Sequence, residues 1–170
     1  STGPPVLSSG PLQLLAILHG IPRAEIFEAR RVLESRTARL AAQRAAGEAL
    51  AAVSEEVMGM FASIDDPQAF LLHDIGFHRA LARASGNLVL SALVEMVSAM
   101  FYEQRKETAS LDRDLRPSAE QHRRIYQAIR ERDADAAERE MDAHLQTSLE
   151  RQEREDERTP PPPPPARRRR

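Results

Sequence analysis

The chain of 170 residues contains no cysteine and no tryptophan. Without cysteine it can form neither a disulfide framework nor a thiolate metal site, which fits a reducing cytoplasm. Aromatic residues make up only 4% of the sequence, so a core must be assembled mainly from aliphatic side chains and methionine. No apolar run approaches the roughly 20 residues of a membrane span, and no signal peptide is recognisable. We therefore expect a cytoplasmic protein without a membrane partner.

Lysine is almost missing as well, because Lys106 is the only one and all other basic side chains are arginines. The chain has 24 basic and 26 acidic side chains, and four of the basic ones are the arginines at 167–170. Without these four arginines the chain therefore has a clearly negative net charge, which makes it a poor electrostatic match for DNA phosphates. With 41% hydrophobic and 29% charged residues, the composition predicts one soluble globular domain.

The glycines and internal prolines stand at helix-length intervals, which marks them as helix ends. Breaks occur at Gly20, Gly47, Pro67, Gly86 and Pro117. Between the breaks apolar residues recur every 3.6 residues, and no alternating segment is long enough for a useful strand. Helices are therefore expected near residues 11–19, 23–46, 48–64, 67–84, 87–108, 118–131 and 133–154. Their short connections predict an all-α, antiparallel helical bundle of six to seven helices.

Residues suited to helix caps support several of these boundaries. Asp66 before Pro67 has the pattern of an N-cap followed by proline at the first helical position. Ser118 and Gln121 have the spacing of a capping box. Asp133 can cap the last helix.

The two ends of the chain differ in composition from the body. Residues 1–10 are expected to be a linker or an expression remnant, and residues 11–152 the folded domain. Residues 153–170 contain a charged segment, a run of prolines and a final run of arginines. Such a segment has little apolar surface to bury, so we expect a disordered charged, polyproline and arginine tail.

Three of the five histidines occupy positions at which an apolar helix face would predict leucine. His78 follows Asp74 by four residues, which places both side chains on one face of a helix. His122 and His144 lie on the apolar faces of two later helices. A hydrogen-bonded core residue explains any one of them alone, but four buried polar groups must all be satisfied. One divalent ion bound to Asp74, His78, His122 and His144 would satisfy them together.

Nitrogen and oxygen ligands without sulfur suit several divalent metals. Zinc is the first choice on affinity and availability, followed by nickel and manganese. Four protein ligands leave one or two further positions if the ion is five- or six-coordinate, and these positions can accept water or the carboxylate of a ligand. The other two histidines, His19 and His73, lack a core placement and are expected at the surface or at its boundary.

Arg30 is another charged residue on an apolar helix face, which it shares with residues such as Phe27 and Leu33. Arginine does not lose its charge by deprotonation, so a guanidinium that faces the core requires an anion. Glu34, one turn further, can be that anion, and the pair would then be purely structural. In the alternative, Arg30 binds the carboxylate of a small molecule that enters the bundle, through two parallel hydrogen bonds.

An ordered series of short motifs resembles a known family. The motifs are E-x-R-x-x-L-E, D-x-x-F-H, A-S-G-N, H-x-x-I-x-x-A-I, R-D-A-x-x-A and M-x-x-H-L, which begin at Glu28, Asp74, Ala84, His122, Arg132 and Met141. Each motif alone is weak, but the ordered set at these spacings is specific. Over about residues 11–150 the chain resembles the FCD domain, the C-terminal effector-binding domain of the FadR subfamily of GntR-type bacterial transcription regulators.

The resemblance implies a bundle of six or seven helices in which one Asp and three His bind a metal, at the positions of Asp74, His78, His122 and His144 here. It also implies that a small organic acid binds beside the metal and that Arg30 contacts it. Asn87 matches a recurrent family residue, although N-capping of a helix is its more economical role. The winged helix-turn-helix that normally precedes this domain has no room in the chain. We therefore expect an excised effector domain or a stand-alone relative.

The sequence thus predicts the effector-sensing domain of a GntR/FadR-type transcription regulator, and not an enzyme. We expect it to bind a small carboxylate metabolite at a metal site, to form a homodimer, and to contact DNA only through a winged helix-turn-helix domain that this chain lacks. An alternative is a metal-dependent hydrolase or isomerase, because such an ion can activate water. This alternative has no general base unless Glu34 is free of Arg30. A third hypothesis is a dimerisation bundle with a purely stabilising metal.

Overall fold

The computed structural model describes residues 20–106 and 114–158, and its regular elements are all α-helices. They are α2 (Arg23–Arg44), α3 (Gly47–Ala62), α4 (Pro67–Ala84), α5 (Leu88–Arg105), α6 (Arg116–Arg130) and α7 (Ala134–Arg158). The described residues contain no strand, which confirms the predicted all-α class, with six helices in this part of the chain. The helix predicted at 11–19 and the linker predicted at 1–10 lie outside the described residues.

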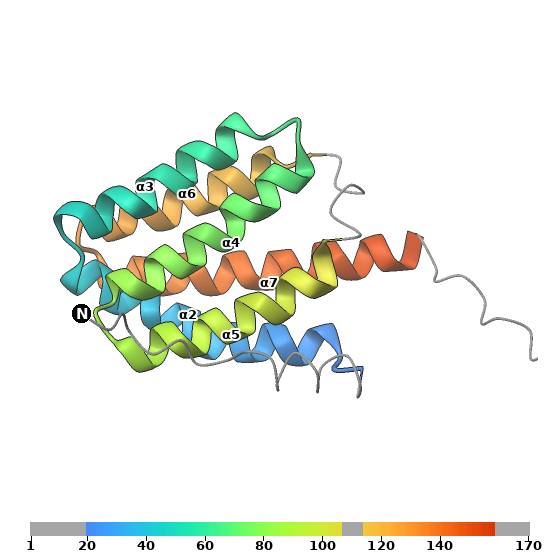
Figure 1. Cartoon of the computed structure of the whole chain (residues 1–170), viewed down its shortest axis with the longest axis horizontal. Helices are drawn as coiled ribbons and strands as arrows, with labels where there is room; N and C mark the ends of the chain where they lie inside the picture. The colour runs from blue at the N-terminus through green and yellow to red at the C-terminus, as the bar shows by residue number, and fades with distance from the viewer. Residues whose placement is uncertain (1–19, 107–113, 159–170) are drawn as a thin grey trace, which may run out of the picture.

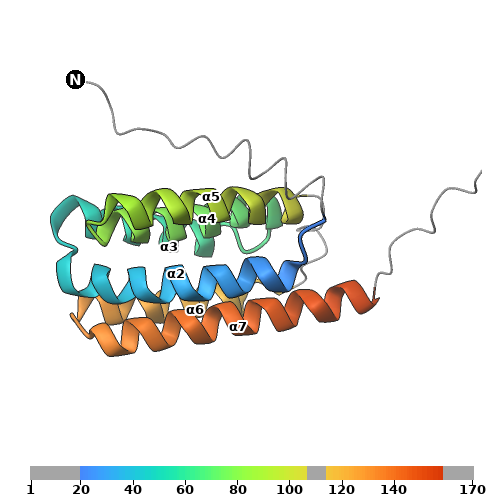
Figure 2. The same cartoon turned by 90° about the horizontal axis from the view of Figure 1, so that it is seen from below.

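Consecutive helices run in opposite directions along one common axis (Figure 1). Seen from below, α3, α4 and α5 form one layer, and α2, α6 and α7 lie on its other side (Figure 2). Helix α2 is central because it contacts α4, α5, α6 and α7. Residues of α2, α4, α6 and α7 can therefore meet inside the bundle, although they are far apart in the sequence.

Three of the expected helix caps are present. The side chain of Asp66 accepts hydrogen bonds from the first-turn amides of α4, and that of Asn87 does the same for α5. Asp133 accepts a hydrogen bond of 2.8 Å from the backbone N–H of Ala136 at the start of α7. Each cap satisfies amides that have no partner within the helix itself. Helices α4, α5 and α7 therefore start where the sequence places them, to within one residue.

The predicted capping box at the start of α6 is wrong. The helix begins at Arg116, and its N-cap residue, Leu115, makes no side-chain cap; the N–H of Arg116 donates instead to Oδ1 of Asp114 at 3.1 Å. Pro117 lies in the first turn, where its fixed φ favours helix and its missing N–H costs nothing. The helix consequently starts two residues earlier than predicted, and Gln121 is available for another contact.

Helix α7 is longer than the sequence suggests. It continues to Arg158, so residues 153–158 of the predicted disordered tail are helical. Glutamate, arginine and glutamine have high helix propensity, which allows a charged segment to extend an existing helix into solvent. The prolines and terminal arginines, within residues 159–170, lie outside the described residues.

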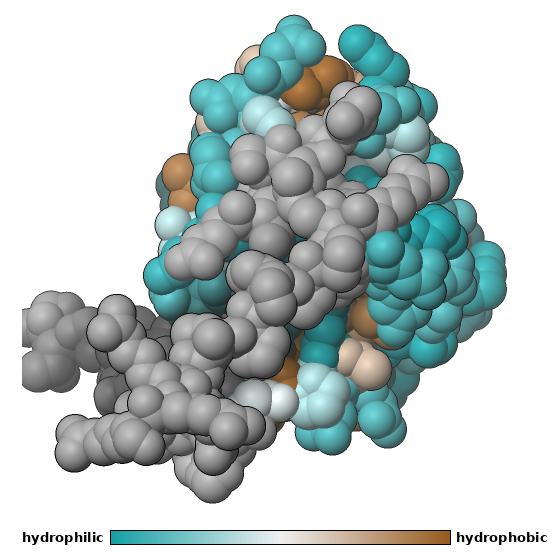
Figure 3. Space-filling model, turned by 90° about the vertical axis from the view of Figure 1, so that its right-hand side faces the viewer, coloured by the Kyte–Doolittle hydropathy of each residue, from teal (hydrophilic) through white to brown (hydrophobic). Residues whose placement is uncertain are grey.

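The core is formed by large apolar side chains from the facing sides of the helices. Those that are fully buried include Phe27, Met60, Phe77, Leu81, Ile125, Ile129, Met141 and Leu145. On the end of the molecule seen in Figure 3, the coloured surface is mainly hydrophilic, with small separate hydrophobic areas. Among the described helices, none has the combination of length and apolar character that crossing a bilayer requires. Within this apolar core the unusual feature is a set of buried polar side chains, which include Arg30, Glu34 and three histidines.

Candidate metal centre

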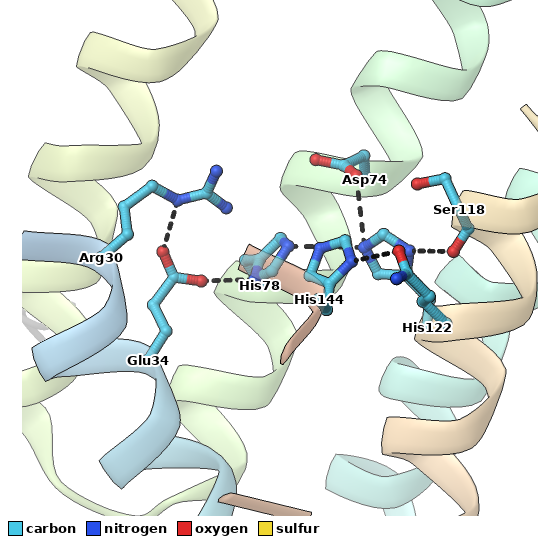
Figure 4. A network of polar contacts seen from close by, with 8 residues as sticks. Arg30, Glu34, Asp74, His78, Ser118, His122 and His144 are labelled. Carbon is cyan, nitrogen blue, oxygen red and sulfur yellow. Dashed lines mark hydrogen bonds and ion pairs between the residues drawn. The ribbon is translucent and has the colours of Figure 1, made fainter. Parts of the chain in front are cut away.

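Four polar side chains from three helices meet inside the bundle. Asp74 and His78 come from α4, His122 from α6 and His144 from α7, and one ligand atom of each lies within 4.8 Å of the others (Figure 4). The three histidines are at most 2% exposed, and the aspartate side chain is 14% exposed. The structure thus brings together all four residues that the sequence predicts as metal ligands, and we call them the Asp/His cluster.

Distances within the Asp/His cluster fit a bound divalent ion. Nε2 of His122 lies 3.4 Å from Nε2 of His78 and 3.2 Å from Oδ1 of Asp74. Two ligands of a tetrahedral zinc ion, each at its usual bond length, are about 3.3 Å apart. These two separations are those that a shared ion would give, although the same atoms also lie within hydrogen-bond or ion-pair distance of one another.

Hydrogen bonds fix which nitrogen of His122 and His144 faces the centre. Nδ1 of His122 lies 2.8 Å from the carbonyl oxygen of Ser118 in the preceding turn of α6. A carbonyl only accepts, so Nδ1 donates, and in the neutral ring the lone pair is then on Nε2. Likewise Nδ1 of His144 lies 3.2 Å from Oε1 of Gln121, the residue predicted as part of the capping box. Both rings therefore direct Nε2 lone pairs toward the cluster.

The buried environment favours the unprotonated form of His78 and His144 and the ionised form of Asp74. Burial lowers the pKa of His78 and, together with the charges of the neighbouring rings, holds the pKa of His144 well below its usual value. Burial alone would raise the pKa of Asp74, but its contact with His122 holds that pKa well below its usual range. Imidazole lone pairs beside an ionised carboxylate form a buried site to which a cation would bind favourably.

Phe77 holds two of the rings in place from one side. It is fully buried, and its ring meets those of His78 and His122 edge to face, with centroids 5.5 and 4.8 Å apart. Close packing of this kind restricts rotation of the imidazoles. In the sequence Phe77 is recognisable only as the phenylalanine of the D-x-x-F-H motif, because its contact with His122 on α6 is a tertiary property.

Arg30 and Glu34 form a buried ion pair beside the cluster. Nε of Arg30 donates to Oε1 of Glu34 at 2.6 Å, and the two side chains are 2% and 1% exposed. Burial alone would raise the pKa of Glu34, but Arg30 and His78 lower it to about 2. Glu34 is thus ionised and paired with Arg30. The hydrolase alternative therefore loses the one general base that the sequence offered it.

A small cavity connects Arg30 with the Asp/His cluster. Its walls include Arg30, Asp74 and His144, together with Phe101 from α5 and Gln152 from α7. The free volume is about 20 Å³, which is room for about one water molecule. Arg30 and two of the predicted metal ligands therefore face one space, and a larger molecule can enter it only if the surrounding side chains or helices move.

His73 lies outside the cluster, at the boundary position expected from the sequence. It is 39% exposed, and its Nδ1 contacts Oε2 of Glu56 on α3 at 2.8 Å. His19 lies outside the described residues. Because His73 lies on the same helix as Asp74 and His78, it offers a matched control for substitutions in the cluster.

Comparison with known proteins gives one consistent family. A family model described as the FCD domain matches residues 25–147. The chain is similar to the HTH-type transcriptional repressor NanR of Salmonella newport, with 32% identity over 126 residues, or 72% of this chain and 48% of the relative. The NanR protein of Klebsiella aerogenes is 31% identical over 126 residues, which cover 73% of this chain and 48% of that protein. The chain thus spans about half the length of these relatives.

Solved structures show the same fold. The structure of Streptococcus agalactiae GntR superimposes with a TM-score of 0.64 at 28% identity, and the match covers 86% of this chain and 61% of that one. E. coli McbR/YncC gives a TM-score of 0.66 at 15% identity, with 77% of this chain and 64% of the other covered. The second similarity concerns the fold alone.

Proposed function

The chain belongs to the FCD domain family of GntR-type transcription regulators, and from this premise we propose that it senses a small carboxylate at a metal ion. The family is one of regulators and not of enzymes, and its domains bind effectors. The observation that carries the metal part of the proposal is the convergence of one ligand atom from each of Asp74, His78, His122 and His144 to within 4.8 Å of one another. Zinc suits this set of ligands best, and nickel and manganese are the next candidates.

The proposed effector is a carboxylate because of what surrounds the cavity. A bound zinc ion would supply positive charge and a position at which a carboxylate oxygen can bind. The guanidinium of Arg30 lines the same cavity and presents further N–H donors besides the Nε that Glu34 uses. A small organic acid would therefore meet two cationic groups at one place, and both favour its ionised form.

The small free volume of the cavity suggests how binding would be transmitted. With room for about one water molecule, the present arrangement excludes an organic acid, so the effector must bind a more open arrangement of the helices. A ligand that prefers one of two arrangements shifts the population toward it. In a homodimer whose whole chains carry the winged helix-turn-helix domains expected from the sequence, this shift would alter the spacing of two DNA-reading domains. Such a regulator would act in the cytoplasm.

Thermal unfolding of the zinc-loaded protein tests carboxylate sensing. We expect one class among dicarboxylates, tricarboxylates, sugar acids and hydroxy acids to raise the midpoint, since a ligand at 100 times its Kd adds about 2.7 kcal/mol to the stability of the native state. Arg30→Ala should abolish the shift. Arg36→Ala should retain it, because Arg36 is exposed and pairs only at 4.0 Å with Glu138. Zinc content is measured after each ligand, because tricarboxylates also remove zinc.

Two results would count against the proposal. An equal midpoint shift in the Arg30→Ala protein would refute the role of Arg30. Chemical conversion of the ligand in the same samples would instead support the hydrolase or isomerase alternative.

A further inference from the structure

Glu34 is a carboxylate that touches both the proposed effector arginine and a member of the Asp/His cluster. Its Oε1 accepts from Nε of Arg30 at 2.6 Å, and its Oε2 is in direct contact with Nδ1 of His78 (Figure 4). Within the described part of the chain, neither Oε2 nor Nδ1 has another hydrogen-bond partner. The two oxygens of a 1% exposed carboxylate are thus divided between a cation and an imidazole.

The contact with Glu34 determines how His78 faces the cluster. An ionised carboxylate can only accept, so Nδ1 of His78 donates and Nε2 carries the lone pair. That Nε2 is the atom 3.4 Å from Nε2 of His122. All three imidazoles therefore have their Nδ1 next to an oxygen, but those of His122 and His144 face a carbonyl and an amide, which are neutral. An anionic acceptor makes an imidazole a stronger ligand than a neutral one does.

Arg30 is held at the other oxygen of Glu34 in a defined orientation. Its guanidinium carbon lies 4.3 Å from the ring centroid of Phe101 and 5.3 Å from that of Phe27. The two rings are themselves perpendicular and 5.7 Å apart, so they form a corner against which the guanidinium packs. A displacement of Arg30 toward a ligand would consequently act directly on Glu34, and through it on His78.

We propose that Glu34 is a positioning residue that couples carboxylate binding at Arg30 to metal binding at His78, and this proposal rests on the proposed function. It orients His78 as a ligand and links that ring to the guanidinium in one continuous contact chain. Carboxylate and metal should then affect each other's affinity by the same factor, as thermodynamic linkage requires. Direct contact of the carboxylate with the ion also contributes to this linkage, so the part that depends on Glu34 is the part that a substitution of Glu34 removes.

Glu34→Gln tests the positioning role through zinc affinity. The amide keeps the size of the side chain but removes its charge, so we expect zinc to bind 10- to 100-fold more weakly, measured by competition with a chelator. Glu56→Gln is the matched control, since Glu56 makes the equivalent contact to the Nδ1 of His73, outside the cluster, and its zinc Kd should not change. A zinc Kd in Glu34→Gln within twofold of the unmodified protein would overturn the proposal.

The tautomer of His78 gives a second test that needs no variant at Glu34. Two-bond proton–nitrogen NMR spectra of the zinc-loaded protein distinguish the two ring nitrogens, and His78→Gln assigns the signal. We expect the proton of His78 on Nδ1, facing Glu34. A proton on Nε2 would overturn the proposal, whatever the stability of the Glu34→Gln protein.

Acetate serves as the probe for coupling, because it is among the smallest carboxylates and the cavity is small. We expect acetate to tighten zinc binding in the unmodified protein and to lose most of this effect in Glu34→Gln. An equal effect in both proteins would overturn the coupling, and so would the absence of any effect in the unmodified protein. The zinc affinity of Glu34→Gln without acetate still tests whether Glu34 orients His78 as a ligand. Failure of carboxylate sensing is therefore distinguishable from failure of the positioning role.

Discussion

Replacing His122 by alanine should remove most of the zinc-dependent stability of the domain. Nε2 of His122 lies 3.2 and 3.4 Å from ligand atoms of Asp74 and His78, so its loss removes a ligand close to two others. We expect the zinc Kd to rise by a factor of about 1,000, which exceeds the effect expected of a residue that only supports a ligand. At a fixed excess of zinc, this factor corresponds to about 4 kcal/mol of stabilisation lost.

The measurement is denaturant unfolding with saturating zinc and with EDTA, for the unmodified protein, His122→Ala and the control His73→Ala. Zinc should raise the unfolding free energy of the unmodified and control proteins by similar amounts and that of His122→Ala much less. The EDTA curves separate this effect from any loss of packing, because they compare the folds without metal. An undiminished zinc effect in His122→Ala would contradict the assignment of His122 as a ligand.

Replacing Arg30 by alanine should destabilise the domain by about 3 kcal/mol, even without metal or effector. The substitution leaves the carboxylate of Glu34, which is 1% exposed, without its cationic partner. Removing one member of a buried ion pair is costly because the other charge remains buried. The remaining contact to His78 reduces the penalty but does not replace a guanidinium that carries a permanent charge.

Urea unfolding in EDTA measures the loss of unfolding free energy in Arg30→Ala. Two further variants show whether this loss comes from the unpaired charge of Glu34. Arg36→Ala removes an exposed arginine from the same helix and should cost less than about 1 kcal/mol. The double variant Arg30→Met, Glu34→Gln removes both charges and should recover much of the stability lost in Arg30→Ala. If the double variant were as unstable as Arg30→Ala or less stable, the unpaired charge of Glu34 would not be the source of the effect.

The sequence predicts the fold well where local signals decide it. Asp66, Asn87 and Asp133 mark helix starts because a cap is a local hydrogen bond between a side chain and nearby amides. The start of α6 is mispredicted because two local signals compete there, and Pro117 prevails over the capping-box pattern of Ser118 and Gln121. The end of α7 is mispredicted because helix propensity continues through a segment that has nothing to bury.

For the candidate site, periodicity predicts which polar residues face the core but not what each one meets there. Arg30 and Glu34 are recognisable as a pair because they are four residues apart on one helix. The contact between Glu34 and His78 depends on how α2 packs against α4, and that is a tertiary property. For the same reason, the contact of Gln121 with His144 across α6 and α7 could not be read from the sequence.

Elemental analysis of the protein purified in metal-replete medium shows whether the Asp/His cluster holds a metal ion. We expect about one zinc, nickel or manganese ion per chain. We also expect a ratio of metal to protein near zero in His78→Ala and in His144→Ala, and the ratio of the unmodified protein in His73→Ala. A ratio near zero in the unmodified protein would contradict the metal centre, and with it the proposal that this domain reads a carboxylate through a bound ion.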